Sequence, residues 1–188
     1  MSVTSPALPA VPVLETSRLR LRGFRAEDFD TWFAISRSIE YHRYFTPEPM
    51  PAEEVWKLLL RSAGHWAVMG YGFWAVEEKA TGRFVGGIGF LNLKRDIDPP
   101  LGDAPEMGWV LDPAIHGRGY ATEGVTAALE WAENHFGPTR MVCIIHPENL
   151  PSLRVAAKFG FHEYARSTYH SAPIVLLERP ASELKVKR

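Results

Sequence analysis

The segment from residue 106 to residue 136 constrains the fold of this chain more than any other. The run EMGWVL at 106–111 has the length of a β-strand, and the glycine-rich turn HGRG follows it closely. Apolar side chains then recur three and four residues apart up to Phe136, which indicates a helix with one buried face. Gly137 and Pro138 end that pattern. The segment predicts a strand, a tight turn and a long amphipathic helix.

The turn from His116 to Thr122 has the composition of a phosphate-binding loop. Gly117 and Gly119 allow a ligand to approach the backbone closely, and the free amides and dipole at the helix start attract anions. Arg118 can add a charged pair of donors. The dinucleotide fingerprint needs glycine at position 122, and the ATP-binding loop needs Gly-Lys followed by Ser or Thr, so neither pattern is met. A turn that binds no ligand stays open as the alternative.

A second strand-to-helix segment follows at residues 141–160. The run MVCII at 141–145 is unbroken and apolar, which is typical of a strand buried on both faces. Asn149 can cap a helix through Phe159, and Gly160 can close it. Cys143 is the only cysteine and is expected to be a small buried hydrophobe with no internal disulfide.

Weaker signals complete the predicted order of elements. Apolar and charged residues alternate at 19–22, as in a strand with one wet face, and helical spacing follows near 29–36 and from Pro51. Strands at 71–77 and 84–91, separated by a short turn, predict an antiparallel hairpin. Residues 94–105 hold three prolines and three aspartates and predict an exposed loop. Two weak strand signals precede Leu177.

Length and composition favour a single domain. With 188 residues and 46% hydrophobic content, we expect one domain at 14–180, a flexible Pro-rich tail at 1–13 and a polar tail at 181–188.

The charge balance bears on the partners of the protein. Basic and acidic residues number 21 and 22, so no overall electrostatic field attracts nucleic acid. No membrane span, signal peptide or metal-ligand spacing is recognisable, so we expect a cytoplasmic protein without metal. A homodimer is the commonest assembly for such chains.

The two motifs together resemble the GNAT acetyltransferase superfamily, and most closely its RimJ/RimL-like branch. The coenzyme motif of the superfamily is Gln or Arg, two residues, Gly, one residue, then Gly or Ala, and residues 116–121 match it except at His116. Tyr-Ala-Thr-Glu at 120–123, His-Pro-Glu-Asn-Leu-Pro-Ser at 146–152 and Lys-Phe-Gly-Phe at 158–161 extend the resemblance. It runs from about residue 14 to residue 177. It implies an α/β (α+β) fold with a mixed, mostly antiparallel sheet of six or seven strands flanked by helices.

The resemblance implies that acetyl-coenzyme A is the cosubstrate and that it binds between the fourth and fifth expected strands. The Val110 and Leu111 backbone and the Asn149 side chain would contact the pantetheine arm, and residues 117–122 would hold the pyrophosphate. For Asn149 a helix cap alone is the alternative. The full implied set is Val110, Leu111, His116, Gly117, Arg118, Gly119, Tyr120, Ala121, Thr122, Asn149, Ser152 and Lys158.

Acetyl transfer to an amine needs a neutral nitrogen, a polarised carbonyl and a proton for the leaving thiolate. By resemblance, Glu106 would accept the proton of the amine directly or through water, and the Ser152 hydroxyl would meet the thioester sulfur. Many family members carry a tyrosine acid where this chain has Ala156, which leaves Ser152, another tyrosine or water to protonate the thiolate. A solvated carboxylate remains the alternative for Glu106, and a helix-start serine for Ser152.

The acceptor amine would be selected by the two early helices and the loop at 94–105, which lie outside the coenzyme motifs. A protein N-terminus and a small-molecule amine stay open as acceptors. A non-catalytic acyl-coenzyme A sensor with the same fold is the alternative function. A nucleotide-dependent oxidoreductase is a weaker one, since position 122 lacks the required glycine.

Overall fold

The computed structural model describes residues 10–45 and 48–181. Most of the two expected tails lies outside these residues, because 1–9 and 182–188 are not described. Near the start of the described chain, the Pro12 carbonyl accepts a hydrogen bond of 2.8 Å from Trp74 Nε1, and Val11 packs against the main core. The first described residues therefore contact the body of the domain.

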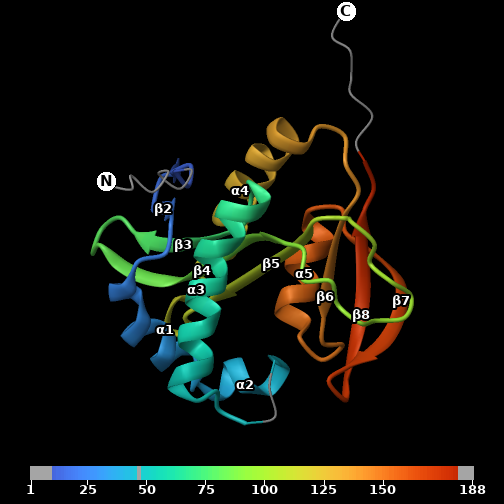
Figure 1. Cartoon of the computed structure of the whole chain (residues 1–188), viewed down its shortest axis with the longest axis horizontal. Helices are drawn as coiled ribbons and strands as arrows, with labels where there is room; N and C mark the ends of the chain where they lie inside the picture. Colours follow the sequence, from blue (N-terminus) through green and yellow to red (C-terminus); the bar gives the residue numbers. More distant parts are fainter. Residues whose placement is uncertain (1–9, 46–47, 182–188) are drawn as a thin grey trace, which may run out of the picture.

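Two strands are followed by three helices and three more strands, and α4 and α5 then flank β6 before the last two strands (Figure 1). The strands are β1 (Leu14–Glu15), β2 (Leu19–Arg22), β3 (Phe73–Glu78), β4 (Arg83–Leu91), β5 (Glu106–Leu111), β6 (Met141–Ile145), β7 (His162–Tyr169) and β8 (Ala172–Arg179). The helices are α1 (Phe29–Ser36), α2 (Ile39–Phe45), α3 (Ala52–Met69), α4 (Tyr120–Phe136) and α5 (Leu150–Lys158), with short 3₁₀ turns η1 (Ala26–Asp28) and η2 (Pro113–Ile115).

The strands form one mixed sheet in the order β1-β2-β3-β4-β5-β6-β8-β7. All neighbours are antiparallel except β5 and β6. The mixed α/β fold in a single domain is confirmed, but the sheet has 8 strands, so the expected count of six or seven is wrong. The added strand is β1, which has only 2 residues and pairs Leu14 with Leu21. A pair this short leaves no alternation in the sequence from which to infer it.

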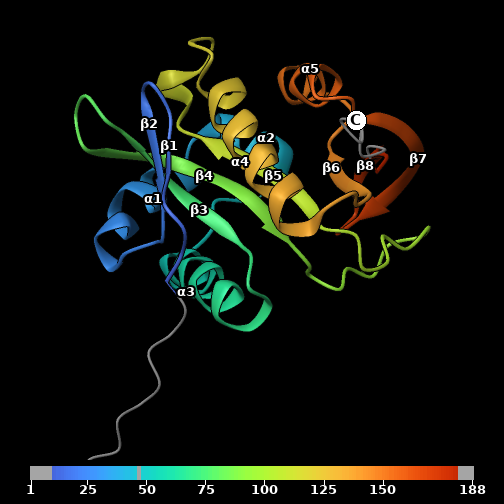
Figure 2. The same cartoon turned by 90° about the horizontal axis from the view of Figure 1, so that it is seen from above.

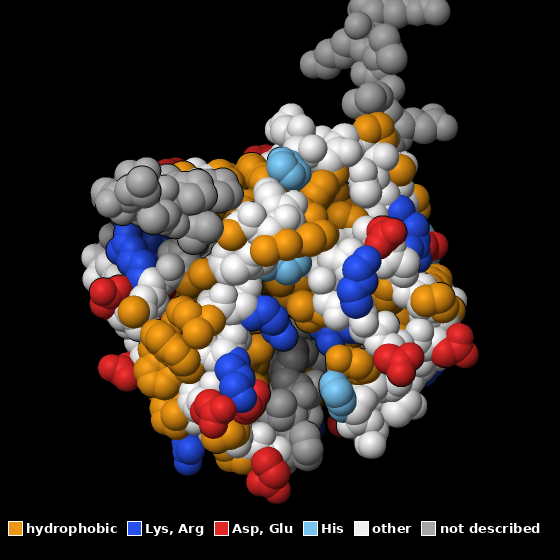
Figure 3. Space-filling view, in the orientation of Figure 1, with side chains coloured by type: hydrophobic (Ala, Val, Ile, Leu, Met, Phe, Trp, Pro, Cys, Tyr) orange, Lys and Arg blue, Asp and Glu red, His pale blue; other side chains and the backbone are white. Residues whose placement is uncertain are grey.

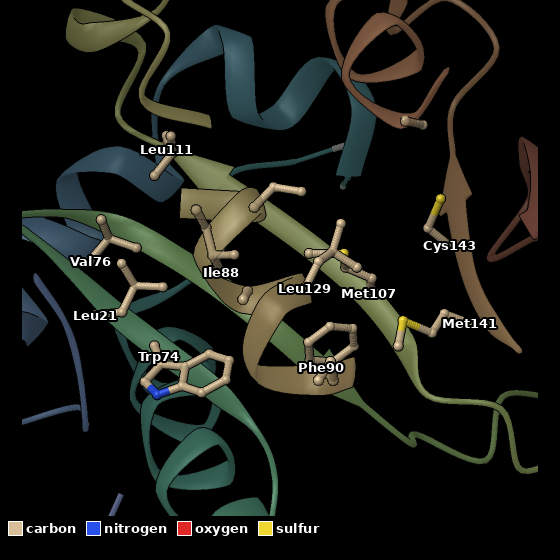
Figure 4. Close-up of a cluster of buried hydrophobic side chains, with 14 of the residues drawn as sticks. Leu21, Trp74, Val76, Ile88, Phe90, Met107, Leu111, Leu129, Met141 and Cys143 are labelled. Atoms are coloured by element: carbon tan, nitrogen blue, oxygen red, sulfur yellow. The ribbon is translucent and has the colours of Figure 1, made fainter. Parts of the chain in front are cut away.

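The core lies on both faces of the sheet. Helix α4 covers one face, where Trp74, Ile88 and Phe90 are fully buried, while α1 and α3 cover the other (Figure 2, Figure 4). Gly124 lets α4 approach β4 closely, because a Cβ atom there would lie 2.4 Å from Ile88 Cδ1. This contact fixes the height of α4 above the sheet.

Two segments show more than the sequence predicted. Helix α2 was not expected; its first residue, Ile39, is 79% exposed, so the helix shows little of the apolar stripe that marks a buried face. The segment at 94–105 is irregular as expected, but Ile97 and Leu101 are buried against β6 and β8. The loop is therefore exposed over most of its length, as predicted, while these two buried side chains hold it against the sheet.

Strands β5 and β6 diverge along the sheet. Their ladder consists of one residue pair, Glu106 with Val142, and the amide of Val142 donates to the Pro105 carbonyl at 3.1 Å. Beyond this point β5 pairs only with β4, and β6 only with β8. Because the two strands are parallel, the opening lies at their carboxyl ends, beside the start of α4 and the start of α5.

Candidate functional site

The turn before α4 adopts a backbone conformation that favours glycine. Gly117 and Gly119 have φ angles of 74° and 78°, in the left-handed region. A Cβ atom at Gly117 would meet nothing within 4 Å, and one at Gly119 would meet only Arg18 Nη2 at 3.5 Å. Glycine is therefore favoured at both positions by the positive φ angles, and not because a larger side chain would collide with the protein. Residues 117–119 are exposed, so the turn is open to a ligand.

The start of α4 offers free amide donors. The first hydrogen bond of the helix runs from the Glu123 amide to the Gly119 carbonyl at 3.0 Å, and no side chain caps the helix. The amides of Tyr120, Ala121 and Thr122 therefore lack an acceptor within the helix, as first-turn amides do. Free first-turn amides and the positive end of a helix dipole together attract anions such as phosphate.

His116 is exposed and links the turn to the end of β5. Its Nε2 atom lies 3.0 Å from the Leu111 carbonyl oxygen. Since a carbonyl only accepts, the ring must carry its proton on Nε2 in this contact. The imidazole thus links the end of β5 to the turn, which gives His116 a structural contact. The same contact occupies the carbonyl of Leu111, one of the residues implied for the pantetheine arm.

Arg118 and Tyr120 turn back onto the protein. The Tyr120 ring is buried, and its hydroxyl donates to Glu78 Oε1 at 2.6 Å. That hydrogen bond raises the pKa of Tyr120 and lowers the pKa of Glu78. Arg118 Nη2 lies 3.2 Å from the Tyr120 hydroxyl, although the Arg118 side chain is 54% exposed. The structure therefore leaves only Arg118 among these side chains available at the surface.

Glu123 ties this turn to the N-terminal strands, a contact that the sequence did not reveal. Its carboxylate accepts hydrogen bonds from the side chains of Thr16, Ser17 and Arg18 and from the Arg18 amide. Burial alone would raise the pKa of Glu123, but these donors outweigh it and lower the pKa to about 2. Arg18 Nη1 also donates to the Arg118 carbonyl at 2.8 Å. The Tyr-Ala-Thr-Glu sequence drew attention to Glu123 itself. It did not indicate the residues that Glu123 contacts, because they lie far away in the chain.

The second motif supplies the opposite wall of the opening. Asn149 is 8% exposed, and its Oδ1 accepts from the Ser152 amide at 3.2 Å, which confirms a helix cap. Ser152 is half-buried, and among the described residues its hydroxyl makes no hydrogen bond. Ala156 is fully buried on the same face of α5. Lys158 is exposed in the last turn, at the end of the helix remote from Asn149.

Glu106 forms a two-pronged ion pair. Arg95 Nε donates to Oε2 at 2.7 Å and Arg95 Nη2 donates to Oε1 at 2.8 Å. Burial alone would lower the pKa of Arg95, but the hydrogen bond and charge of Glu106 outweigh it and raise the pKa. The Arg95 guanidinium also lies over the Tyr169 ring, 4.9 Å from its centre. Both carboxylate oxygens thus already accept a hydrogen bond from a cation, and an incoming amine would have to share them with Arg95.

The side chain of Glu106 points away from α4. Val110, on the same face of β5, packs with the cluster around Trp32 and Tyr41, whereas Trp109 packs with the α4 core. Glu106 therefore faces α2 and α3, the region expected to select an acceptor. Helix α2 also reaches the end of β6, where the Tyr44 and His146 rings are 5.7 Å apart. Figure 3 shows the molecule from the side on which α3 lies, with Lys or Arg side chains beside a hollow near the middle of the view.

Two further features bear on the chemistry. Within residues 10–45 and 48–181, no group of three or more His, Cys, Asp or Glu side chains is arranged to hold a metal ion. Among the same residues, no helix is long and apolar enough to cross a membrane.

Comparisons with known proteins agree with this geometry. Residues 18–162 match the family model described as an acetyltransferase (GNAT) domain. A solved GnaT-family acetyltransferase from Bordetella pertussis is 33% identical, with a TM-score of 0.79 over 90% of this chain and 99% of that chain. The Bacillus subtilis (strain 168) protein YkkB is 32% identical over 112 residues, which are 58% of this chain and 63% of that protein. The match thus spans slightly less than two thirds of YkkB.

A more distant structure shares the fold. The ribosomal-protein-S5-alanine acetyltransferase from Vibrio fischeri is 18% identical, with a TM-score of 0.72 over 93% of this chain and 100% of that chain.

Proposed function

Because this chain belongs to the GNAT acetyltransferase family, we propose that it transfers the acetyl group of acetyl-coenzyme A to a primary amine. The observation that carries the proposal is the opening between β5 and β6, which ends beside the free amides of α4. An extended arm can lie against the strand edges while a pyrophosphate meets the helix start. Both halves of an acyl-coenzyme A thus have a matching surface.

The residues that would hold the coenzyme come from both motifs. The turn at 117–119 and the amides of residues 120–122 would bind the pyrophosphate, with Arg118 as the charged side chain nearby. Asn149, Ser152 and the backbone of Val110 would line the arm. Tyr120 and His116 would act indirectly by holding the turn, since their side chains are bonded within the protein. The coenzyme supplies the activated acetyl thioester.

The reaction would be direct attack in a ternary complex. The amine nitrogen forms a bond to the acetyl carbon, the carbon–sulfur bond breaks, and the proton lost by the amine balances the one gained by the thiolate. An α-amine with a pKa near 8 is about 20 to 30% neutral at pH 7.4, whereas a lysine is only about 0.1% neutral. An N-terminal or other weakly basic amine therefore needs less assistance.

Glu106 is proposed as the carboxylate that faces the amine. Its pairing with Arg95 uses one lone pair on each oxygen, and a carboxylate has further acceptor positions for an amine or a water molecule. We therefore assign it an orienting role, with the proton passing on to water. Ser152, whose hydroxyl is free among the described residues, is proposed as the donor to the thiolate.

The proposed branch is the RimJ/RimL-like one. It is supported by the Tyr-Ala-Thr-Glu sequence and by the shared fold of the Vibrio fischeri enzyme, whose name states that it acts on a ribosomal protein. By analogy, protein N-termini are candidate acceptors alongside small amines. A sensor remains the second candidate, because Glu106 is already bound to Arg95 and Ala156 replaces the family's tyrosine acid.

The test is thiol release from acetyl-coenzyme A with peptides bearing free N-termini, lysine side chains, polyamines and aminoglycosides. Calorimetry of coenzyme A binding is run in parallel. Turnover with any class supports the transferase and names its acceptor. Binding without turnover supports the sensor. Failure of coenzyme A to bind would refute both functions.

A further inference from the structure

The side chains around Glu106 carry an excess of positive charge. Arg95 and Arg61 both interact electrostatically with Glu106, and Tyr41 and Tyr169 also interact electrostatically with Arg61. Burial raises the pKa of Tyr41 to about 12, so its hydroxyl is neutral at physiological pH. Arg95 and Arg61 thus bring two positive charges near the one negative charge of Glu106, and these three groups have a net charge of about +1.

Arg61 reaches this cluster from α3. It lies one helical turn before His65, on the same face of the helix. His65 Nε2 accepts a hydrogen bond of 3.0 Å from the Asn92 amide, where the chain leaves β4 for the segment that carries Arg95. Helix α3 thus runs beside that segment. Arg61 therefore lies on the face of the sheet towards which Glu106 points.

The two arginines differ in their bonding. Arg95 is fully engaged by Glu106 and by the face of Tyr169. Arg61 forms no hydrogen bond and no ion pair with any residue in the described part of the chain. It is exposed along part of its length, yet its surroundings desolvate the guanidinium, and this burial together with repulsion from Arg95 lowers the pKa of Arg61. An anion placed beside Arg61 would stabilise its charged form and so offset both effects.

We propose that Arg61 is the binding site for an anionic group on the acceptor, so that the acceptor is an amine that also carries a carboxylate or a phosphate. This inference rests on the proposed acetyl transfer and names its substrate class. Glu106 would face the amine and Arg61 the anion, so one molecule with both charges meets two complementary partners. A guanidinium binds either anion through a planar pair of donors.

The test uses pairs of acceptors that differ only in the anion. β-Alanine is compared with β-alaninamide, phosphoethanolamine with ethanolamine, and a peptide with N-terminal Asp with its N-terminal Asn counterpart. We expect kcat/KM to favour the anionic member of at least one pair by about 10- to 100-fold, the range of a charge-assisted hydrogen bond. The first two pairs distinguish carboxylate from phosphate.

Variants of α3 assign the preference to a residue. Arg61→Gln should bring the ratio of anionic to neutral acceptor towards one, whereas Arg61→Lys should keep part of it, since it keeps the charge but not the fork. Lys57→Gln is the matched control, because Lys57 lies one turn earlier and pairs with Glu53 and Glu54. It should leave the ratio unchanged.

Calorimetry separates this inference from the proposed function. The anionic and neutral members are titrated into protein saturated with coenzyme A, which needs no turnover. Tighter binding of an anionic member, lost in Arg61→Gln, supports the anion site even if no acetyl transfer occurs. Equal affinity for both members of every pair, or a preference that survives Arg61→Gln, would overturn it. Failure of coenzyme A itself to bind would instead count against the transferase.

Discussion

The Arg18 guanidinium and the Glu123 carboxylate meet through a 2.6 Å contact between Nε and Oε2, although the two residues are 105 positions apart. The contact joins the loop between β1 and β2 to the first turn of α4. Since Arg18 also donates to the Arg118 carbonyl, the proposed phosphate-binding turn is supported by a residue that precedes β2.

Replacing Glu123 by Gln should destabilise the protein by about 2 kcal/mol at pH 6, because several donors lose a charged acceptor. Glu123 has a pKa of about 2 when folded, below the ordinary value near 4.5. A lowered folded pKa means that the stabilisation is present above the unfolded pKa and is lost as the pH falls towards 2. Urea unfolding of both proteins should therefore show a difference that shrinks between pH 5 and pH 3.

The control for this variant is Glu130→Gln, an exposed position on the same helix. It should change stability by less than about 0.5 kcal/mol at either pH. A difference between wild type and Glu123→Gln that stays constant with pH would show that packing, rather than charge, explains the loss.

The proposed coenzyme site is tested by two glycines with the same backbone conformation. Gly119 and Gly160 have φ angles of 78° and 79°, and alanine would meet open space at Gly160 and only Arg18 at Gly119. Each Ala variant should lose about 1 kcal/mol of stability from backbone strain. Only Gly119→Ala should weaken coenzyme A binding, by about tenfold in calorimetry. Equal affinities in the two variants would place the coenzyme elsewhere.

The role of Glu106 is tested by Glu106→Gln, which removes the charge that balances Arg95. We expect kcat to fall by about 10- to 100-fold while the dissociation constant for coenzyme A changes little. Glu163→Gln breaks a similar two-pronged pair with Arg166 on the exposed face of β7 and serves as the control. Parallel losses of turnover and coenzyme affinity in Glu106→Gln would indicate a structural carboxylate.

The contact between α4 and β4 predicts a coupling between two core positions. Gly124→Ala should add helix propensity, yet its Cβ would meet Ile88 Cδ1 at 2.4 Å. Ile88→Val removes that carbon. Gly124→Ala should therefore be more favourable by about 1 kcal/mol in the Ile88→Val background than in the wild type, as measured by denaturant unfolding of all four proteins. Additive effects would mean that the helix shifts freely at this point.

Local signals allowed much of the fold to be predicted. The long helix α4 has a continuous apolar stripe, and its boundaries at Gly119 and Gly137 follow from residues that adopt positive φ. The cap at Asn149 is also encoded within three residues of sequence. Each of these features depends on neighbours along the chain, which is why the pattern alone suffices.

The contacts around the site depend on residues that are distant in the chain, and no local pattern indicated them. Arg95 lies in a segment rich in proline and aspartate, with nothing to indicate that it turns towards Glu106. Arg18 and Glu123 belong to different elements, and their meeting depends on the height of α4 above the sheet. Patterns of apolar residues locate the motifs, whereas the ion pairs that organise them arise only from the tertiary packing.

The divergence of β5 and β6 leaves two strand edges facing each other inside one molecule, each without a ladder beyond the pair of Glu106 and Val142. Unpaired edges are templates on which strands of other chains can add. A ligand with amide groups along its arm would cover both edges at once, so the protein deprived of that ligand should exchange its backbone hydrogens there faster and associate with itself more readily. Supply of the ligand would then govern the solubility of the protein as well as its turnover.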